Sequence, residues 1–370
     1  MKTRGARFLV LAVVVFAAAA LLMWFGQGEE ALSASEQPPV EFPRRLRAQE
    51  KTRAQARRTW VSPTQPDAGP QGATDPLLAA LPRGKGKTAV VLEANALRHS
   101  PIGELLLECL YRDGGKQLQQ LKERTGIDPL TDLDRLAITD EGLVLSGNFG
   151  QAKTDELLGQ HGRSSYGDSA RIYEPPAERA LADGGVGRGG GPTLATWRNQ
   201  MIVVGRDRNG VRDVIDRVEG RGPQEPPVLG ETATYGEVYG VIATRTLANV
   251  LPPEQRELAE QLVRAAGAVE LHVDARGDVA VVADVKGEDA QAVSDLGKSL
   301  GGALSLARMR AQSQGQEDLA KLLDFARVRP DGEAFRMEVA LPLDVLKERL
   351  AFCREPVPEA AAGDGGGERL

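Results

Sequence analysis

The densest group of side chains that could do chemistry is a run of three carboxylates, Asp128, Asp132 and Asp134. Three acids this close together could present oxygen ligands to Ca²⁺. Their spacing lacks the alternating acids, the glycine and the final glutamate of an EF-hand loop. Asp128 precedes Pro129, which is typical of a helix N-cap followed by proline, and Asp132 would then fall in the first turn, where the helix dipole favours an acid. We therefore expect a helix start here and no metal site.

The histidines give no better case for catalysis or metal binding. The chain has three, His99, His161 and His272, with no HExxH spacing and no CxxC, so a zinc site is not expected. His99 adjoins Ser100, but adjacent residues rarely place a base against its nucleophile, and Ser100 followed by Pro101 is expected to cap a helix. The GxSxG elbow of a hydrolase is also absent from the sequence. The sequence therefore predicts no catalytic residues.

Two glycine-rich segments match phosphate-binding loops only in part. Residues 86–88 read Gly-Lys-Thr, but Leu81 stands where a P-loop needs its first glycine, and the segment precedes a strand. Gly185, Gly187 and Gly190 fit GxGxxG, yet they lead into a predicted strand, so no helix N-terminus would face a pyrophosphate. No cofactor is expected.

Cys109 and Cys353 are the only cysteines of the chain. In an oxidising compartment an even pair is consistent with a disulfide, which would join the first long helix to the last one. Each cysteine also lies on an apolar helical face, where a buried free thiol would be equally suitable. The sequence leaves both alternatives open.

An uncharged apolar run at residues 8–25 follows Lys2, Arg4 and Arg7. Its 18 residues would form a helix about 27 Å long, close to the roughly 30 Å of a bilayer core and longer than a typical cleaved signal peptide. The sequence therefore predicts export and a retained signal anchor or transmembrane helix at 1–26. Cleavage after Ala34 or Ser35, followed by secretion, is the alternative. No cysteine lies directly after the run, which excludes a lipoprotein.

Charge around the apolar run predicts its orientation. The basic residues before it and the acidic pair just after it favour a cytoplasmic N-terminus and a body in the periplasm, anchored to the inner membrane. A basic cluster between Arg44 and Arg58 argues against this orientation, but it begins at the limit of the distance over which such charges count.

Charge and composition also exclude classes of ligand. The net charge of the chain is −6, and because the first 58 residues carry about +5, residues 59–370 carry about −11. Such a body repels phosphate backbones, so we expect no nucleic acid as its partner. With only 4% aromatic residues, wide stacking surfaces for bases or sugars are not expected either.

Hydrophobic periodicity predicts an α+β fold with mainly antiparallel sheets packed against helices. We expect two short helices near residues 102–110 and 118–121, a helix at 151–160, and a helix from Pro252 to about Ala266. A match between VLSGNFGQAKTDELL and VVADVKGEDAQAVSDL suggests two related units. The predicted organisation is a basic, Pro/Gln-rich disordered linker at 27–87, an α+β domain at 88–220, a linker at 221–235, an α+β domain at 236–353 and a disordered tail at 354–370.

Over residues 88–350 the sequence resembles a loosely defined group of uncharacterised exported bacterial proteins. The resemblance rests on TGIDPLTDLDRLAIT, which holds a Gly-x-Asp-Pro-x-x-Asp turn, and on the later LVLSGNF and TWRNQMIVVGRDRNGVRDVIDRV. The function of the group is unassigned. The resemblance therefore implies export and an α+β fold, and it carries over no catalytic residues.

The sequence therefore predicts a membrane-anchored envelope protein of unknown biochemical activity. We expect its body to be a non-enzymatic interaction module that binds a protein or another envelope component. Two alternatives remain open. An envelope hydrolase would need a histidine or carboxylate with a base or nucleophile beside it. A carrier of hydrophobic ligands would need an apolar cavity between sheet and helices.

Overall fold

The computed structural model describes residues 75–176, 179–180, 186–187, 191–223, 225–230, 233–250, 256–331 and 334–354. The predicted signal anchor at 1–26, most of the predicted linker and nearly all of the predicted tail lie outside these residues, as do Gly185, Gly190 and Pro252. No helix within the described ranges has the length and apolar character to cross a bilayer.

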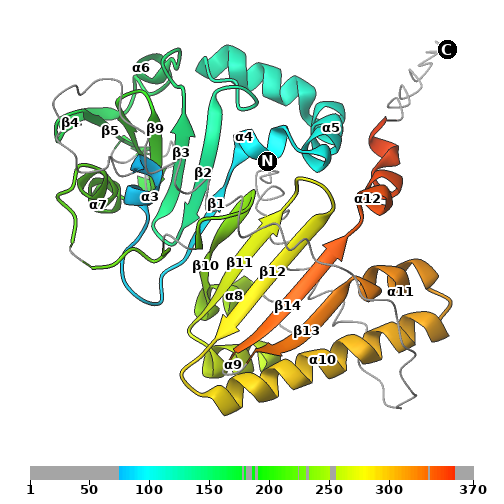
Figure 1. Ribbon diagram of the computed structural model, residues 1–370. Helices are drawn as coiled ribbons and strands as arrows, with labels where there is room; N and C mark the ends of the chain where they lie inside the picture. The colour runs from blue at the N-terminus through cyan, green and yellow to red at the C-terminus, as the bar shows by residue number, and fades with distance from the viewer. Residues whose placement is uncertain are drawn as a thin grey trace, which may run out of the picture.

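Twelve of the described strands form one antiparallel sheet, in the order β13-β14-β12-β11-β10-β1-β2-β3-β9-β8-β5-β4 (Figure 1). The short strands β6 and β7 pair only with each other. The strands are β1 (Ala89–Leu92), β2 (Leu133–Thr139), β3 (Gly142–Gly147), β4 (Gly162–Tyr166), β5 (Ala170–Glu174), β6 (Arg179–Ala180), β7 (Val186–Gly187), β8 (Thr193–Trp197), β9 (Met201–Gly205), β10 (Val238–Ala243), β11 (Ala268–Asp274), β12 (Val279–Lys286), β13 (Ala326–Asp331) and β14 (Ala334–Leu341).

Helices surround this sheet, so the expected α+β class with an antiparallel sheet is confirmed. In Figure 1, α7 lies beside the strands of the first half, α10 and α11 lie beside β13, and α5 and α12 meet near the ends of the strands. The helices are α3 (Pro76–Ala80), α4 (Ala94–Arg98), α5 (Pro101–Thr125), α6 (Thr154–Leu157), α7 (Arg208–Val218), α8 (Thr244–Val250), α9 (Arg256–Ala265), α10 (Ala290–Ser313), α11 (Glu317–Asp324), α12 (Leu343–Arg349) and the 3₁₀ helix η3 (Ala351–Arg354).

Both halves of the sheet have the same order of connections. Outward from the centre, the first half runs β1, β2, β3, β9, β8 and the second runs β10, β11, β12, β14, β13. In each half a helix follows the first and the third of these strands, and the last hairpin returns to pair beside the third. The first half adds the β4–β5 hairpin at its outer edge. This shared order supports the hypothesis of two related units.

The pairing of β1 with β10 makes the sheet continuous between the predicted domains 88–220 and 236–353. The hydrophobic side chains nevertheless form separate clusters, one within residues 77–239 and another within residues 247–335. The domain limits themselves stay a prediction. In the predicted linker between the domains, Leu229 is buried in the first cluster and Val228 donates a backbone hydrogen bond to Pro82.

The N-terminal boundary of the folded body differs from its prediction. Asp75 caps α3 by accepting hydrogen bonds from the amides of Leu77 and Leu78, and Leu77, Ala80 and Leu81 are buried in the first hydrophobic cluster. The prediction of a disordered linker is therefore wrong for residues 75–81. The sequence pattern does not predict this helix, because its five residues are too few to show an amphipathic period.

The region from Ser100 to Gly126 forms one helix, α5, where two short ones were predicted. The predicted start is confirmed, since Ser100 accepts a hydrogen bond from the amide of Gly103 and Pro101 follows it. Gly114 and Gly115 lie inside the helix without ending it, and Gly126, with φ of 69°, closes it in the left-handed conformation.

Two further elements differ from their predictions. The helix predicted at 151–160 is reduced to α6, four residues long, and strand β4 was not predicted. The helix predicted from Pro252 to Ala266 is present as α9.

Candidate functional site

Alternate residues of a strand point to opposite faces of the sheet, so each face can be followed from one half to the other through the paired residues. We call the face that carries Val91, Ala137 and Val144 face A, and the face that carries Val90, Ile138 and Leu143 face B. Registry continues both faces through the pairing of β1 with β10. In the first half, α3 and α7 pack on face A, because Leu77, Val211 and Ile215 share a buried cluster with its strand residues.

Buried ion pairs hold α3 and α7 on face A. Asp75 accepts two hydrogen bonds from the guanidinium of Arg135 on β2, at 2.5 and 2.8 Å. Hydrogen bonding to Asp75 raises the pKa of Arg135 against the opposing effect of its burial. Arg217 on α7 is buried, donates to the carbonyl of Ala80 and pairs with Glu141 at 2.5 Å. Face A of the first half is therefore closed by helices that are fixed in place.

Face B of the first half carries two adjoining rows of apolar side chains across β1, β2, β3, β9 and β8. Leu143 stands in one row between Ile138 and Val204, and Leu145 stands in the other between Leu136 and Ile202. We call these two rows the apolar strip. Its nine members are Val90, Leu92, Leu136, Ile138, Leu143, Leu145, Leu194, Ile202 and Val204.

All nine members of the apolar strip are partly exposed. None of them belongs to, or packs against, a hydrophobic cluster of the described residues. Their neighbours on the same strands that point to face A, such as Ala137 and Val144, are almost fully buried. The five strands span about 19 Å at a strand spacing of roughly 4.8 Å, and with a width of about 10–12 Å the strip covers roughly 200 Å². A contiguous, partly exposed apolar patch can mark a binding surface.

The equivalent part of face B in the second half is covered. The row of Val90 continues through Gly240 to Leu271 on β11 and Ala283 on β12, and both side chains are buried. They share a cluster with Val293 and Leu296 of α10. Gly297 of that helix lies so close to the sheet that a Cβ atom there would be 3.0 Å from the side chain of Phe335. Face B is thus closed by α10 in the second half, whereas no helix of the described residues shares a hydrophobic cluster with the apolar strip.

The predicted carboxylate cluster forms a turn, and the helix expected there is absent. Asp128 accepts a hydrogen bond from the amide of Leu130, and its own amide donates to Asp132. Lys122 pairs with Asp128 at 3.0 Å. Burial raises the pKa of the Asp128 carboxyl, but the hydrogen bonds from Lys122 and from the amide of Leu130 together lower it below its ordinary value. Asp134 is exposed on β2. No group of three or more metal-ligating side chains occurs within the described ranges.

The structure does not bring His99 and Ser100 together as a catalytic pair. Nδ1 of His99 lies 2.7 Å from the carbonyl oxygen of Asn95, and the hydroxyl of Ser100 donates to Leu97 while it accepts from the amide of Gly103. Both side chains therefore make hydrogen bonds to the backbone at the junction between α4 and α5. His161 lies in the turn before β4, with its backbone amide bonded to Leu158.

His272 is the histidine with the most ordered surroundings. It is buried on β11 and stacks on Tyr235 with a ring-centre distance of 3.7 Å. Its Nε2 lies 2.9 Å from Glu270, and its Nδ1 lies 3.3 Å from the carbonyl oxygen of Tyr235. The hydrogen bond from His272 lowers the pKa of the Glu270 carboxyl. Because an acceptor faces each ring nitrogen, neither nitrogen is placed to take a proton from a substrate.

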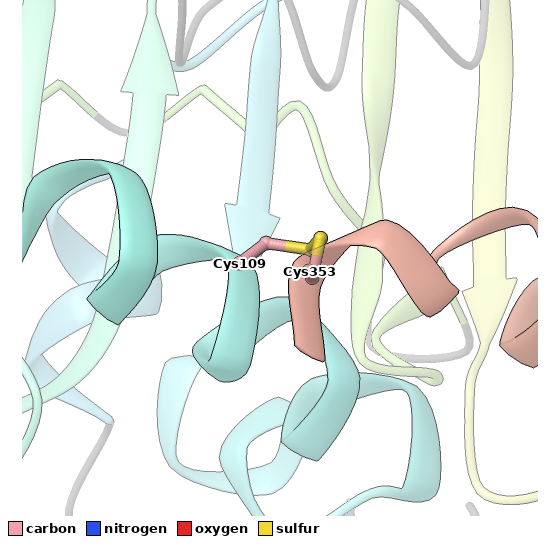
Figure 2. Close-up of a disulfide and its surroundings, with 2 residues drawn as sticks. All are labelled: Cys109 and Cys353. Atoms are coloured by element: carbon pink, nitrogen blue, oxygen red, sulfur yellow. A yellow bond between two sulfur atoms is a disulfide. The ribbon is translucent and has the colours of Figure 1, made fainter. Parts of the chain in front are cut away.

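Cys109 and Cys353 form a disulfide, which Figure 2 shows between α5 and η3. Their Cα atoms are 4.7 Å apart and 244 positions apart in the sequence. The bond is flanked by a hydrophobic cluster in which Ile102 and Leu105 of α5 meet Leu346 of α12. The disulfide therefore links the first half of the chain to its C-terminal helices.

The segment with the partial P-loop match lies just before strand β1. Residues 85–87 are exposed, and the amide of Thr88 donates to Asp140 at 2.6 Å. Thr88 directly precedes strand β1, so this segment leads into a strand and not into the helix that follows a P-loop. In the GxGxxG segment, Gly187 belongs to the short strand β7.

Sequence reasoning missed the apolar strip. Its signal was present in the near-continuous apolar runs of β2, β3 and β9, such as LVL and MIVV, which place apolar side chains on both faces. A strand of this kind predicts two covered faces, and the first half supplies helices for only one.

Comparisons with known proteins add little. No protein-family model matches the chain, and no curated protein matches it. The solved crystal form I of TP0453 is similar over 75% of this chain and 97% of its own, with 12% identity and a TM-score of 0.39. A likeness at this level carries no argument about fold or function.

Proposed function

We propose that this chain is a membrane-anchored envelope protein whose folded body is a non-enzymatic interaction module, with the apolar strip as its binding surface. The observation that carries the proposal is the strip itself, nine partly exposed apolar side chains on a face that a helix covers in the other half of the molecule. Leaving such a face in water costs free energy, roughly 25 cal/mol per Å² of apolar surface. A binding partner would recover that free energy.

The placement of the ionisable groups supports binding over catalysis. His272 faces an acceptor at each ring nitrogen, and His99 and Ser100 are engaged in the α4–α5 junction. The alternatives of a hydrolase and of a hydrophobic-ligand carrier are favoured by no specific observation in the described residues.

The N-terminal sequence supports the anchor and the location outside the cytoplasm. The apolar run at 8–25 has the length and flanking charges of a signal anchor. Residues 27–74 have the composition of a flexible spacer, whose r.m.s. reach would be roughly 40 Å. A body held in this way would stay near the membrane and still sample partners around it.

The binding proposal is tested by photo-crosslinking in intact cells. A photoreactive amino acid replaces Leu143 at the centre of the strip, and in a matched control it replaces Lys298, whose side chain is exposed on α10. We expect a discrete adduct from position 143 and none from position 298. Equal labelling from both positions, or no adduct from either, would overturn the proposal.

The predicted orientation is tested separately. A reporter enzyme that is active only outside the cytoplasm is fused after Leu350, and activity is expected. Activity of a cytoplasm-specific reporter at the same position would reverse the orientation and remove the envelope from the proposal.

A further inference from the structure

We propose that the occupant of the apolar strip is an amphipathic α-helix of a partner protein, lying across strands β1, β2, β3, β9 and β8. This inference rests on the proposed function, because it names the partner of the same surface. It follows from the shape of the strip, from the way the second half closes the equivalent surface, and from the charges at one end.

The shape of the strip suits one helix. It is two rows wide, and alternate residues on a strand are about 7 Å apart, so with its side chains the strip is about as wide as the 10–12 Å diameter of a helix. Its length of about 19 Å corresponds to roughly 13 helical residues.

The second half of the molecule shows how this surface is closed. After β12 the chain forms α10, 24 residues long, whose Val293, Leu296 and Leu300 share a cluster with the buried residues of face B. The corresponding segment after β3 in the first half forms only α6, four residues long. The two halves have the same strand order, but within the described residues the first half has no helix as long as α10 after its third strand. A helix supplied by another protein would complete it.

Charges at the outer end of the strip favour one orientation of the incoming helix. Arg171 continues the second row on β5, and Arg163 stands beside it on β4. Both guanidinium groups are about half exposed and share a single carboxylate, that of Asp155 on α6, at 3.4 and 3.3 Å. One positive charge is therefore in excess at this end. An acidic residue at the end of the incoming helix that lies over β5 would balance it.

The probe for this inference is a synthetic peptide with the sequence of residues 289–313, because this segment is the helix that covers face B in the second half. The labelled peptide is titrated with the full chain, and binding is followed by fluorescence anisotropy and by the gain in helical circular dichroism. We expect saturable binding with a gain in helix. A control peptide with Leu296, Leu300 and Leu304 changed to serine should bind at least tenfold more weakly.

Two variants of the full chain locate the binding. Leu143→Glu places a charge at the centre of the strip and should weaken peptide binding at least tenfold, while Leu143→Val should bind as the native chain does. Ile202→Lys in the neighbouring row should reproduce the effect of Leu143→Glu. Thermal unfolding checks that each variant is folded, and Lys298→Glu on α10 serves as a surface control.

The outcomes separate this inference from the proposed function. If the peptide does not bind, or if it binds equally well to Leu143→Glu, the helix inference is overturned. Crosslinking from position 143 then decides the wider proposal. An adduct to lipid or to a second copy would leave a binding surface with a different occupant, whereas an adduct to residues 8–25 of this chain would make the strip an internal contact and overturn both proposals. If no adduct forms, both proposals fail.

Discussion

The two halves of the sheet share one order of connections and differ in which face their helices cover. In the first half, α3 and α7 close face A, and no described helix shares a hydrophobic cluster with the apolar strip on face B. In the second half, α10 closes face B, and face A carries a row of charged side chains in which Glu270, Asp284 and Arg336 are aligned in register. The same strand order therefore yields one partly exposed face that is apolar and one that is polar.

This difference shows that the exposed apolar face is not a consequence of the topology. The second half places charges on the face that it leaves without a core helix, and it pairs them, since Arg336 binds Asp284 at 2.6 Å and Arg329 binds Glu338 at 3.2 Å. A sequence that only needed to be soluble could have done the same in the first half. The nine apolar residues of the strip are therefore the basis for proposing a partner.

The largest expected effect concerns the covalent link between the halves. Replacing Cys109 and Cys353 together with serine should lower the free energy of unfolding by about 3–5 kcal/mol, because the bond closes a very long loop in the unfolded chain. The native chain in reductant should behave like the double variant in urea unfolding. A loss of less than about 1 kcal/mol would mean that the hydrophobic contacts between α5 and α12 suffice to hold this end.

The next effect compares the two halves directly on face B. Leu271→Ala should cost about 3 kcal/mol, because Leu271 is buried beneath α10 and its loss leaves a cavity. Leu121→Ala is the control, since Leu121 is exposed on α5. Urea unfolding measures both variants. A small cost at Leu271 would mean that α10 does not close face B as described.

Close packing of α10 gives a smaller effect with an internal control. Gly297→Ala would put a Cβ atom 3.0 Å from Phe335, and overpacking should destabilise the chain by about 1 kcal/mol in spite of the better helix propensity of alanine. Gly302→Ala in the same helix has no neighbour within 4 Å and should stabilise the chain by up to about 1 kcal/mol. Thermal unfolding should show a lower midpoint for Gly297→Ala and a higher midpoint for Gly302→Ala. Equal shifts would contradict the close approach of helix and sheet.

A still smaller effect tests the polar face of the second half. The hydrogen bond from His272 lowers the pKa of Glu270, so the folded state favours the charged carboxylate. This contribution is fully present above the ordinary glutamate pKa of 4.5 and is lost as the pH falls through the lowered value. The stability of Glu270→Gln should therefore fall less steeply with acid than that of the native chain. If the stability of both chains falls equally as the pH is lowered, then the charged Glu270 carboxylate does not stabilise the fold.

Much of the fold could be predicted from local patterns. The alternation of Val269, Leu271 and Val273 is enough to indicate one buried face of β11, and apolar residues three and four apart are enough to indicate the helices α7 and α10. The α5 helix was split in the prediction, because Gly114 and Gly115 lower helix propensity and only the completed fold shows that the helix continues past them.

The candidate site could not be predicted in the same way. Leu143 and Leu145 have the same residue type and period as buried strand residues, and nothing local separates them from Leu271. Their partial exposure arises because no helix of the described residues shares a hydrophobic cluster with them, which is a property of the whole arrangement. The Cys109–Cys353 bond was likewise undecided, because 244 positions of chain separate two residues that the fold brings together.

The smallest expected effect is the most informative about the strip. Leu143→Ala should change the free energy of unfolding by less than about 0.5 kcal/mol, because the side chain is partly exposed and packs on no hydrophobic cluster of the described residues. The corresponding change at Leu271 removes the same atoms from beneath a helix, so the pair isolates the contribution of that covering. If the two substitutions cost the same in the isolated chain, then another part of the same chain covers Leu143. In that case the strip would be an internal contact, and no partner would be needed to explain it.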